Sequence, residues 1–390
     1  MSGVMEEAEE LYGYGLLFGP DKQVCSLHIN DIAVRSHIRK FGKKGSCNYC
    51  GKDKIILHLE DLMKFLMQTV AYFYSDPVEF SSYSSAEGGY LVPYLDAWEI
   101  LQDNFDLEID SNKLFEDMES WIDFGKVWAD EKMMHDSGHY SRPSSWSHFC
   151  YLVKHKARYL FHAYKNEYDF EAERAITILK EAEKMIMRYG LIRTLDEGTS
   201  LLRCRQHDKS EIIVNITQMC APEIQYCNNP NRMSPAGISM FYCAFEPETA
   251  LRETLDVNWR GSKYTIANFV TKDKLKIVDL SKLPLLPSLF DINKRRKYED
   301  LIFLKDFIND LAKPIERDGK VHINYVPTQI VTEYFRYMGK QKVDGIIYPS
   351  SKNLGYSAMV LFFDHYASQE KLQFLPKSIE TNKIQTFIKK

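Results

Sequence analysis

The chain has 390 residues, which at roughly 150 residues per domain predicts two or three domains. Its net charge of −4 argues against a protein held to nucleic acid mainly by a large basic surface. The acidic start MSGVMEEAEELYGYG lacks the apolar segment of a secretory signal, and no long apolar run follows. The eight cysteines are not spread like a disulfide framework. We therefore expect a cytoplasmic protein with reduced thiols and no membrane span.

Four cysteine and histidine residues near the start have the spacing of a zinc site. Cys25 and His28 are separated by two residues, and Cys47 and Cys50 repeat that spacing after an 18-residue spacer. Two paired-ligand turns of this kind are typical of a zinc ribbon, and four protein ligands close the coordination sphere. The sequence therefore predicts a structural zinc. His37 is an alternative fourth ligand, because a second cysteine is more usual where His28 stands.

The residues from about 55 to 190 carry a helical pattern. The segment LHLEDLMKFLMQTVAYFY has apolar residues at the i, i+3, i+4, i+7 spacing of an amphipathic helix. Asp96 with Glu99 predicts a capping-box start for the next helix, and Ser111 is expected to cap the one after it. The clearest helix is predicted for EAERAITILKEAEKMIMRYG, where Gly190 provides the left-handed end.

After about residue 195, short β-rich runs replace this pattern. They are IIVNIT, ISMFYCAF, KYTIANFV, LKIVDL, DGIIYPS and SAMVLFF, with helices expected at YEDLIFLKDFINDLA and TQIVTEYFRYMG. This mixture predicts an α+β fold with mixed or antiparallel sheets. We predict four segments, which are a zinc-ribbon-like knuckle (1–54), a helical domain (55–194), an α+β domain (195–367) and a C-terminal extension (368–390).

Strong motifs of several enzyme classes are absent. The sequence holds no phosphate-binding P-loop, dinucleotide-binding glycine fingerprint, nucleophile-elbow serine or HExxH helix. What remains is a polar set in the α+β segment, composed of Arg203, Arg232, Tyr242, Glu253 and Ser350. Each of them alone has an ordinary interpretation, such as an ion-paired arginine, a packed tyrosine or a turn serine.

Taken together, these residues and their surroundings resemble the RES-domain family, named for an arginine, a glutamate and a serine. The resemblance covers roughly residues 195–367 and rests on LLRCR, NRMSPAGISMFYCAFEPETALRE, LKIVDL, YVPTQIVTEYFR and VDGIIYPSS followed by MVLFF. The N-terminal half is similar to the region ahead of some RES domains, where a cysteine-rich knuckle precedes a helical HEPN-like segment. The segments EGGYL and WSHFCYLVKHKARYLF carry that second resemblance.

The resemblance implies a RES domain with a fold similar to that of ADP-ribosyltransferase toxins. It implies an NAD-degrading enzyme, a glycohydrolase or phosphorylase, that acts as a toxin or defence effector regulated by its N-terminal half. A separate antitoxin or activator protein is an expected partner. The family residues carry over to Arg203 or Arg205, Arg232, Tyr242, Glu253 and Ser350. Met233 departs from the family pattern, because an aromatic residue usually follows the second arginine.

The chemistry of NAD cleavage fits these residue types. Planar guanidinium groups match a pyrophosphate, and a carboxylate such as Glu253 stabilises the oxocarbenium-like centre from which nicotinamide leaves. Tyr242 would offer a ring face to the cationic nicotinamide. Ser350 would bond the ribose or the amide, and it is not assigned as a nucleophile because no motif places a histidine base beside it.

Other functions stay open at this point. The segment RPSSWSH offers Arg142 and His148 at the spacing of HEPN-type RNases, but proline follows the arginine and short motifs match easily by chance. An ADP-ribosyltransferase acting on a macromolecule and a catalytically silent binding protein are further alternatives. Nucleic acid is not expected as a partner unless the HEPN-like segment binds RNA, and a homo-oligomer is left open.

Overall fold

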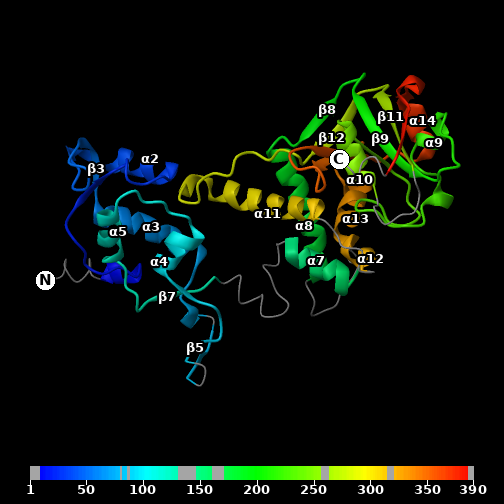
Figure 1. The fold of residues 1–390 in the computed structure, drawn as a ribbon. Coiled ribbons are helices and arrows are strands. Elements are labelled where there is room, and N and C mark those ends of the chain that lie inside the picture. Colours follow the sequence, from blue (N-terminus) through cyan, green and yellow to red (C-terminus); the bar gives the residue numbers. More distant parts are fainter. Residues whose placement is uncertain are drawn as a thin grey trace. The chain divides into compact units, whose positions relative to one another are not determined.

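The structure of the chain is a computed structural model (Figure 1). It describes residues 9–79, 81–85, 88–130, 146–159, 171–255, 263–313 and 320–384. The chain divides into two compact units. Unit 1 contains Met1–Arg142 and Leu285–Asp300, and unit 2 contains Pro143–Pro284 and Leu301–Lys390. These units are defined by contacts within the fold and do not test the bounds of the four segments predicted from the sequence, which stay a prediction.

Unit 1 combines small sheets with helices. Its three-stranded sheet has the order β1-β3-β2 and is antiparallel. Two further pairs of short strands, β4-β5 and β6-β7, complete its described strands. The elements are β1 (Gln23–Cys25), α2 (Ile32–Phe41), β2 (Lys43–Ser46), β3 (Asp53–His58), α3 (Leu59–Phe73), η1 (Pro77–Glu79), β4 (Tyr83–Ser84), β5 (Gly89–Tyr90), β6 (Leu95–Asp96), α4 (Ala97–Glu99), η2 (Ile100–Asn104), α5 (Asn112–Glu119), β7 (Val127–Trp128) and η4 (Ile292–Lys294).

Local chemistry explains several helix ends of unit 1. Asp96 and Glu99 form the predicted capping box of α4, and Ser111 caps α5 by accepting the N–H of Leu114. The apolar stripe of α3 is buried, as its periodicity predicts. The helical pattern nevertheless misses the strands β3 to β7, because two- to six-residue strands leave little periodic signal.

Unit 2 is built on a nine-stranded, mostly antiparallel sheet. The strand order is β15-β11-β9-β10-β14-β13-β12-β8, with β16 also paired to β11. Only β12 and β13 pair in parallel among the described strands. The strands are β8 (Ile192–Leu195), β9 (Ser200–His207), β10 (Phe241–Ala244), β11 (Lys263–Thr271), β12 (Leu275–Asp279), β13 (Gly345–Pro349), β14 (Ser357–Leu361), β15 (Leu372–Phe374) and β16 (Glu380–Lys383).

Helices cover both faces of this sheet (Figure 1). They are α7 (Trp146–His155), α8 (Glu171–Arg188), α9 (Ile216–Met219), η3 (Ile224–Tyr226), α10 (Pro247–Thr254), α11 (Arg295–Ala312), α12 (Val321–Asn324), α13 (Val326–Glu333), η5 (Tyr334–Met338), α14 (His365–Lys371) and η6 (Pro376–Ser378). Helix α11 crosses the boundary between the units at Asp300. The predicted helix end at Gly190 is confirmed, since this glycine has a φ of +64°.

Alternation along the strands divides the core of unit 2 into two sets of side chains. One face, here called the α10 face, carries Tyr242, Ala244, Ile346, Tyr348, Ala358 and Val360. The opposite face, here called the α14 face, carries Phe241, Cys243, Ile347, Met359 and Leu361. The α10 face packs against α10 and the layer of α7, α8, α11 and α13, whereas the α14 face packs against α9 and the start of β15.

The α+β fold class is confirmed by this mixture of helices and sheet. The predicted C-terminal extension contributes to the sheet, because β15 and β16 both pair with β11. A chain of hydroxyl contacts adds to that pairing, since Thr265 lies 2.8 Å from His207 Nε2 and 2.7 Å from Thr381 Oγ1.

None of the described helices is long and apolar enough to cross a membrane.

Candidate active site and metal centre

The glutamate and the serine of the predicted set meet in direct contact. Helix α10 begins at Pro247, whose fixed φ suits the first helical turn, and places Glu253 in its last turn. Ser350 follows strand β13 and donates its hydroxyl to Glu253 Oε1 at 2.5 Å. The serine is 3% exposed, whereas the glutamate is half-buried. One oxygen of the carboxylate is therefore held in place by a buried donor.

The loop after Ser350 anchors this pair to α10. The backbone N–H groups of Lys352 and Asn353 donate to Ser350 Oγ at 3.3 and 3.0 Å, which leaves the serine proton directed at the carboxylate. Asn353 Nδ2 also donates to Thr249 Oγ1 of α10 at 2.8 Å. The serine is thus a positioned donor to the carboxylate, and no histidine contacts it among the described residues.

Tyr242 lies on the same face of the sheet as this pair. It belongs to β10, where its hydroxyl is 3.0 Å from Ser234 Oγ. Burial raises the pKa of the phenol, so the residue stays neutral and keeps its proton. The ring packs against the core cluster of the α10 face. The backbone of β10 fixes the Cβ end of this ring and Ser234 fixes its hydroxyl, so a neutral ring face is available for a ligand.

Arg232 approaches from the loop before β10. The loop is tied to α13, because Thr328 Oγ1 donates to the Arg232 carbonyl at 2.5 Å and Gln329 Nε2 donates to the Asn231 carbonyl at 2.8 Å. Burial raises the pKa values of both Tyr242 and Tyr348, and the positive charge of Arg232 opposes this rise, which places its guanidinium in the neighbourhood of these rings. Within the described residues the guanidinium has no carboxylate partner, so it can bind an anion.

Arg203 and Arg205 lie on the other side of the sheet. The Arg203 guanidinium is 5.0 Å from the centre of the Phe241 ring, which belongs to the α14 face. Its Nη1 donates to the Tyr242 carbonyl at 2.8 Å, and burial lowers its pKa. Arg205 is paired with Glu211 at 2.7 Å. The structure therefore does not bring these two side chains beside Glu253. Arg203 instead bonds the backbone of β10 from the α14 face.

Met233, the residue that departs from the family pattern, has a core role in this structure. Its side chain is fully buried in the cluster of α7, α8 and α13, and Thr332 Oγ1 lies 3.4 Å from its sulfur. A side chain in this position packs the loop against α13 and offers no surface for stacking on a ligand.

Tyr348 of β13 is a member of this region that the sequence reading missed. The charge of Glu253 raises its pKa and the charge of Arg232 lowers it, in addition to the larger effect of burial. In the sequence it stands inside the apolar run GIIYPS, where a tyrosine reads as a core residue of a strand. The available signal was the spacing, because Tyr348 stands two residues before Ser350 and residues two apart in a strand point to the same face.

The four predicted metal ligands form one cluster in unit 1. The ligand atoms of Cys25, His28, Cys47 and Cys50 all lie within 4.8 Å of one another. Two thiolates bound to a tetrahedral zinc at about 2.3 Å would lie about 3.8 Å apart, and the Cys25 and Cys50 sulfurs are 3.8 Å apart. The turn that carries the second pair is closed by Gly51 at a φ of +66°, with its N–H donating to the Cys47 carbonyl at 2.8 Å.

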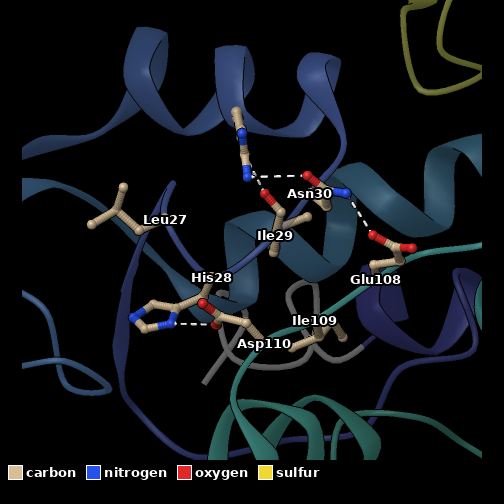
Figure 2. A pocket seen from close by; sticks show the side chains of 8 residues that line it. Leu27, His28, Ile29, Asn30, Glu108, Ile109 and Asp110 are labelled. Atoms are coloured by element: carbon tan, nitrogen blue, oxygen red, sulfur yellow. Dashed lines mark hydrogen bonds and ion pairs between the residues drawn. The ribbon is translucent and has the colours of Figure 1, made fainter.

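The histidine of the cluster is held by Asp110 (Figure 2), and its ligand atom lies within 4.8 Å of the three sulfurs. Its Nδ1 is 2.7 Å from Asp110 Oδ1, whereas its buried Nε2 has no hydrogen-bond partner. A carboxylate that bonds one ring nitrogen fixes the other as a metal ligand. A bound metal would explain why a buried nitrogen close to three thiols has no hydrogen-bond partner. The residues therefore fit a metal ion, and the four-ligand set would be a closed, structural site.

The thiols differ in their ease of deprotonation. Burial alone would raise the pKa of Cys47, but the backbone N–H groups of Tyr49 and Cys50 outweigh it, and the pKa lies below the usual range. Burial raises the pKa of Cys25 to about 11. A metal that enters the cluster would therefore displace at least the Cys25 proton.

His37, the alternative ligand, is not part of the cluster. Its ring stacks on Phe65 at a centroid distance of 3.8 Å and contacts Phe41 at 4.7 Å. Burial lowers its pKa, which keeps the ring neutral in this aromatic setting. His28 is therefore the fourth member of the ligand set.

Replacing Asp110 by alanine is expected to weaken metal binding without removing a ligand. The loss of this hydrogen bond frees the His28 ring to rotate and to exchange its tautomer, so the metal affinity should fall by about 10- to 100-fold. Competition with a chromogenic chelator measures the change. Glu108→Ala, a neighbour on the same segment that bonds Asn30 and not His28, is the matched control. Equal affinity in both variants would contradict the role of Asp110.

The RNase candidates cannot be placed as a pair. Arg142 lies outside the described residues, and His148 belongs to α7, where its side chain is also outside them. The structure thus adds nothing to the motif RPSSWSH beyond the helix that contains its histidine.

Comparison with protein families finds a match in each half of the chain. The family model HEPN/RES N-terminal domain 1 matches residues 40–167, and the RES domain model matches residues 221–376. The chain therefore contains a RES domain, preceded by a HEPN/RES N-terminal domain. Neither the curated proteins nor the solved structures gave a match.

The RES match contains the residues that the structure brings together. Arg232, Tyr242, Glu253 and Ser350 fall inside residues 221–376, whereas Arg203 and Arg205 precede that range. A RES domain suggests an enzyme that acts on NAD. The cluster of Cys25, His28, Cys47 and Cys50 begins ahead of the HEPN/RES match and ends within it.

Proposed function

We propose that the RES domain cleaves the nicotinamide–ribose bond of NAD, by hydrolysis or by phosphorolysis. The observation that carries the proposal is the Glu253 carboxylate, with one oxygen fixed by the buried Ser350 hydroxyl and the other without a partner among the described residues. A carboxylate held beside an oxocarbenium-like centre stabilises the charge that develops there.

The proposed reaction breaks one bond and forms one. The C1–N bond of the nicotinamide riboside opens heterolytically, and its electron pair leaves with neutral nicotinamide. Water or phosphate then adds to C1 of the ribose. With water the released proton passes to Glu253 or to solvent, and the products are nicotinamide and ADP-ribose. With phosphate they are nicotinamide and an ADP-ribose 1-phosphate.

The other residues of the site bind and orient the substrate in this proposal. Arg232, which has no carboxylate partner in the described part of the chain, binds the pyrophosphate with paired hydrogen bonds. Tyr242 offers its neutral ring to the nicotinamide, a contact of roughly 1–2 kcal/mol when desolvated. Ser350 acts on the substrate only through Glu253, because its proton is already committed to the carboxylate.

The biological role proposed for this activity is that of a toxin or defence effector. Its N-terminal half would regulate the RES domain, with a zinc bound by the cysteine–histidine cluster as a structural element. A separate antitoxin or activator protein belongs to the same proposal. Transfer of ADP-ribose to a macromolecule is the alternative outcome for the same site, since it differs only in the group that adds to C1.

The test is a nicotinamide-release assay on the full chain. The purified protein is incubated with NAD, with and without phosphate, and the products are separated by chromatography. Release of nicotinamide with ADP-ribose supports hydrolysis, and formation of the 1-phosphate supports phosphorolysis. Absence of nicotinamide release under both conditions would contradict the proposed function. Nicotinamide release with label from NAD retained on protein or nucleic acid would favour transfer.

A further inference from the structure

One row of paired residues crosses the sheet directly beneath α10. Tyr348 of β13 is paired with Ala358 of β14, which is paired with Ala244 of β10, and Ala244 is paired with Leu202 of β9. Paired residues of neighbouring strands point to the same face. Two buried alanines therefore lie side by side on the α10 face, next to the single large ring of Tyr348.

Tyr348 and Ser350 point to the same side of the chain. They are two residues apart at the end of β13, and the backbone pairing continues past the strand, because the Ser350 N–H donates to the Tyr356 carbonyl at 2.9 Å. Ser350 in turn bonds Glu253 Oε1. The carboxylate proposed to act on the substrate is thus held on the side to which the Tyr348 ring points.

Three other groups of the site surround the same ring. The charges of Glu253 and Arg232 both act on the Tyr348 phenol, and Tyr242 lies close enough to affect it as well. Burial holds the pKa of Tyr348 well above its usual range, and the residue is 5% exposed. The hydroxyl therefore remains a neutral donor at neutral pH.

We propose that Tyr348 is a substrate-positioning residue, whose hydroxyl bonds the ribose next to the scissile bond. This inference rests on the proposed function. A ribose has hydroxyl groups that accept a hydrogen bond, and a donor fixed by β13 would hold the sugar with C1 facing Glu253. Such positioning acts mainly on the chemical step, because a misplaced sugar still binds through its pyrophosphate at Arg232.

The test compares Tyr348→Phe with the unaltered chain and with Tyr366→Phe. Phenylalanine keeps the ring and its packing, so the melting temperature should be unchanged. The kcat of nicotinamide release should fall by about 10-fold or more while KM changes little, because one hydrogen bond to the substrate is lost. Tyr366 is 79% exposed on α14 and serves as the matched control, with kinetics equal to those of the unaltered chain.

The outcomes separate this inference from the function on which it rests. Nicotinamide release by Tyr348→Phe at an unchanged kcat would overturn the inference and leave the proposed function standing. Absence of release by the unaltered chain would overturn both. A lower kcat together with a lowered melting temperature would also overturn it, because the hydroxyl would then support the fold and not the substrate.

Discussion

Glu253→Gln is expected to reduce the kcat of nicotinamide release by roughly 10³-fold. The amide keeps the size of the side chain but carries no charge, so it cannot stabilise the positive centre at ribose C1. The helix should be unaffected, because Glu253 is half-buried in the last turn of α10 and makes no ion pair with a described residue. Nicotinamide release by the purified variant, with circular dichroism to check the fold, measures the effect.

The matched control is Glu248→Gln on the same helix. Glu248 is exposed in the first turn of α10 and pairs with Arg252 at 2.6 Å, away from Ser350. An exposed i,i+4 pair contributes only a few tenths of a kcal/mol, so this variant should keep full activity. Comparable losses in both variants would mean that α10 responds to any lost charge, and the assignment of Glu253 would fail.

Cys47→Ser is expected to release the bound zinc and unfold unit 1. Serine is a poor zinc ligand, and the three remaining groups leave the coordination sphere open. Structural zinc contributes on the order of 10 kcal/mol to small domains, which is comparable with the whole stability of such a unit. Metal analysis should give one zinc per chain for the unaltered protein and none for the variant. Thermal unfolding should lose the transition of unit 1.

Two controls make this result specific. His37→Gln alters the histidine that stacks on Phe65 outside the cluster and should keep the metal. Cys227→Ser changes a buried cysteine of unit 2 and should also keep it. Retention of one zinc per chain by Cys47→Ser would contradict the assignment of Cys47 as a metal ligand. Loss of zinc from His37→Gln would instead identify His37 as the fourth ligand, in place of His28.

Features set by local chemistry could be predicted from the sequence. The metal cluster is one, because each ligand pair is separated by two residues and a short turn places both on one side. The helix ends at Asp96, Ser111 and Gly190 are others, since caps depend on residues within one turn. The helix ends needed no knowledge of how distant segments pair, and for the metal cluster the spacing within each ligand pair was enough to predict it.

The site of unit 2 could not be assembled in that way. Glu253 and Ser350 are 97 positions apart, and no periodicity reports that they touch. Only the family resemblance joined them. The two arginines show the same limit, because the pattern LLRCR tells that Arg203 and Arg205 share a face but not which face. That choice depends on the register of β9 against β10, which is recorded by the single pair Ala244 and Leu202.

The pairing of β16 and β15 with β11 has a consequence for how the RES domain can be isolated. A fragment cut at residue 367, as the sequence segmentation suggests, would leave one whole side of the nine-residue strand β11 unpaired. Its sequence, KYTIANFVT, is rich in β-branched and aromatic residues. A bare edge of this length and composition recruits strands from other molecules, so such a fragment would aggregate even though every residue of the site is present.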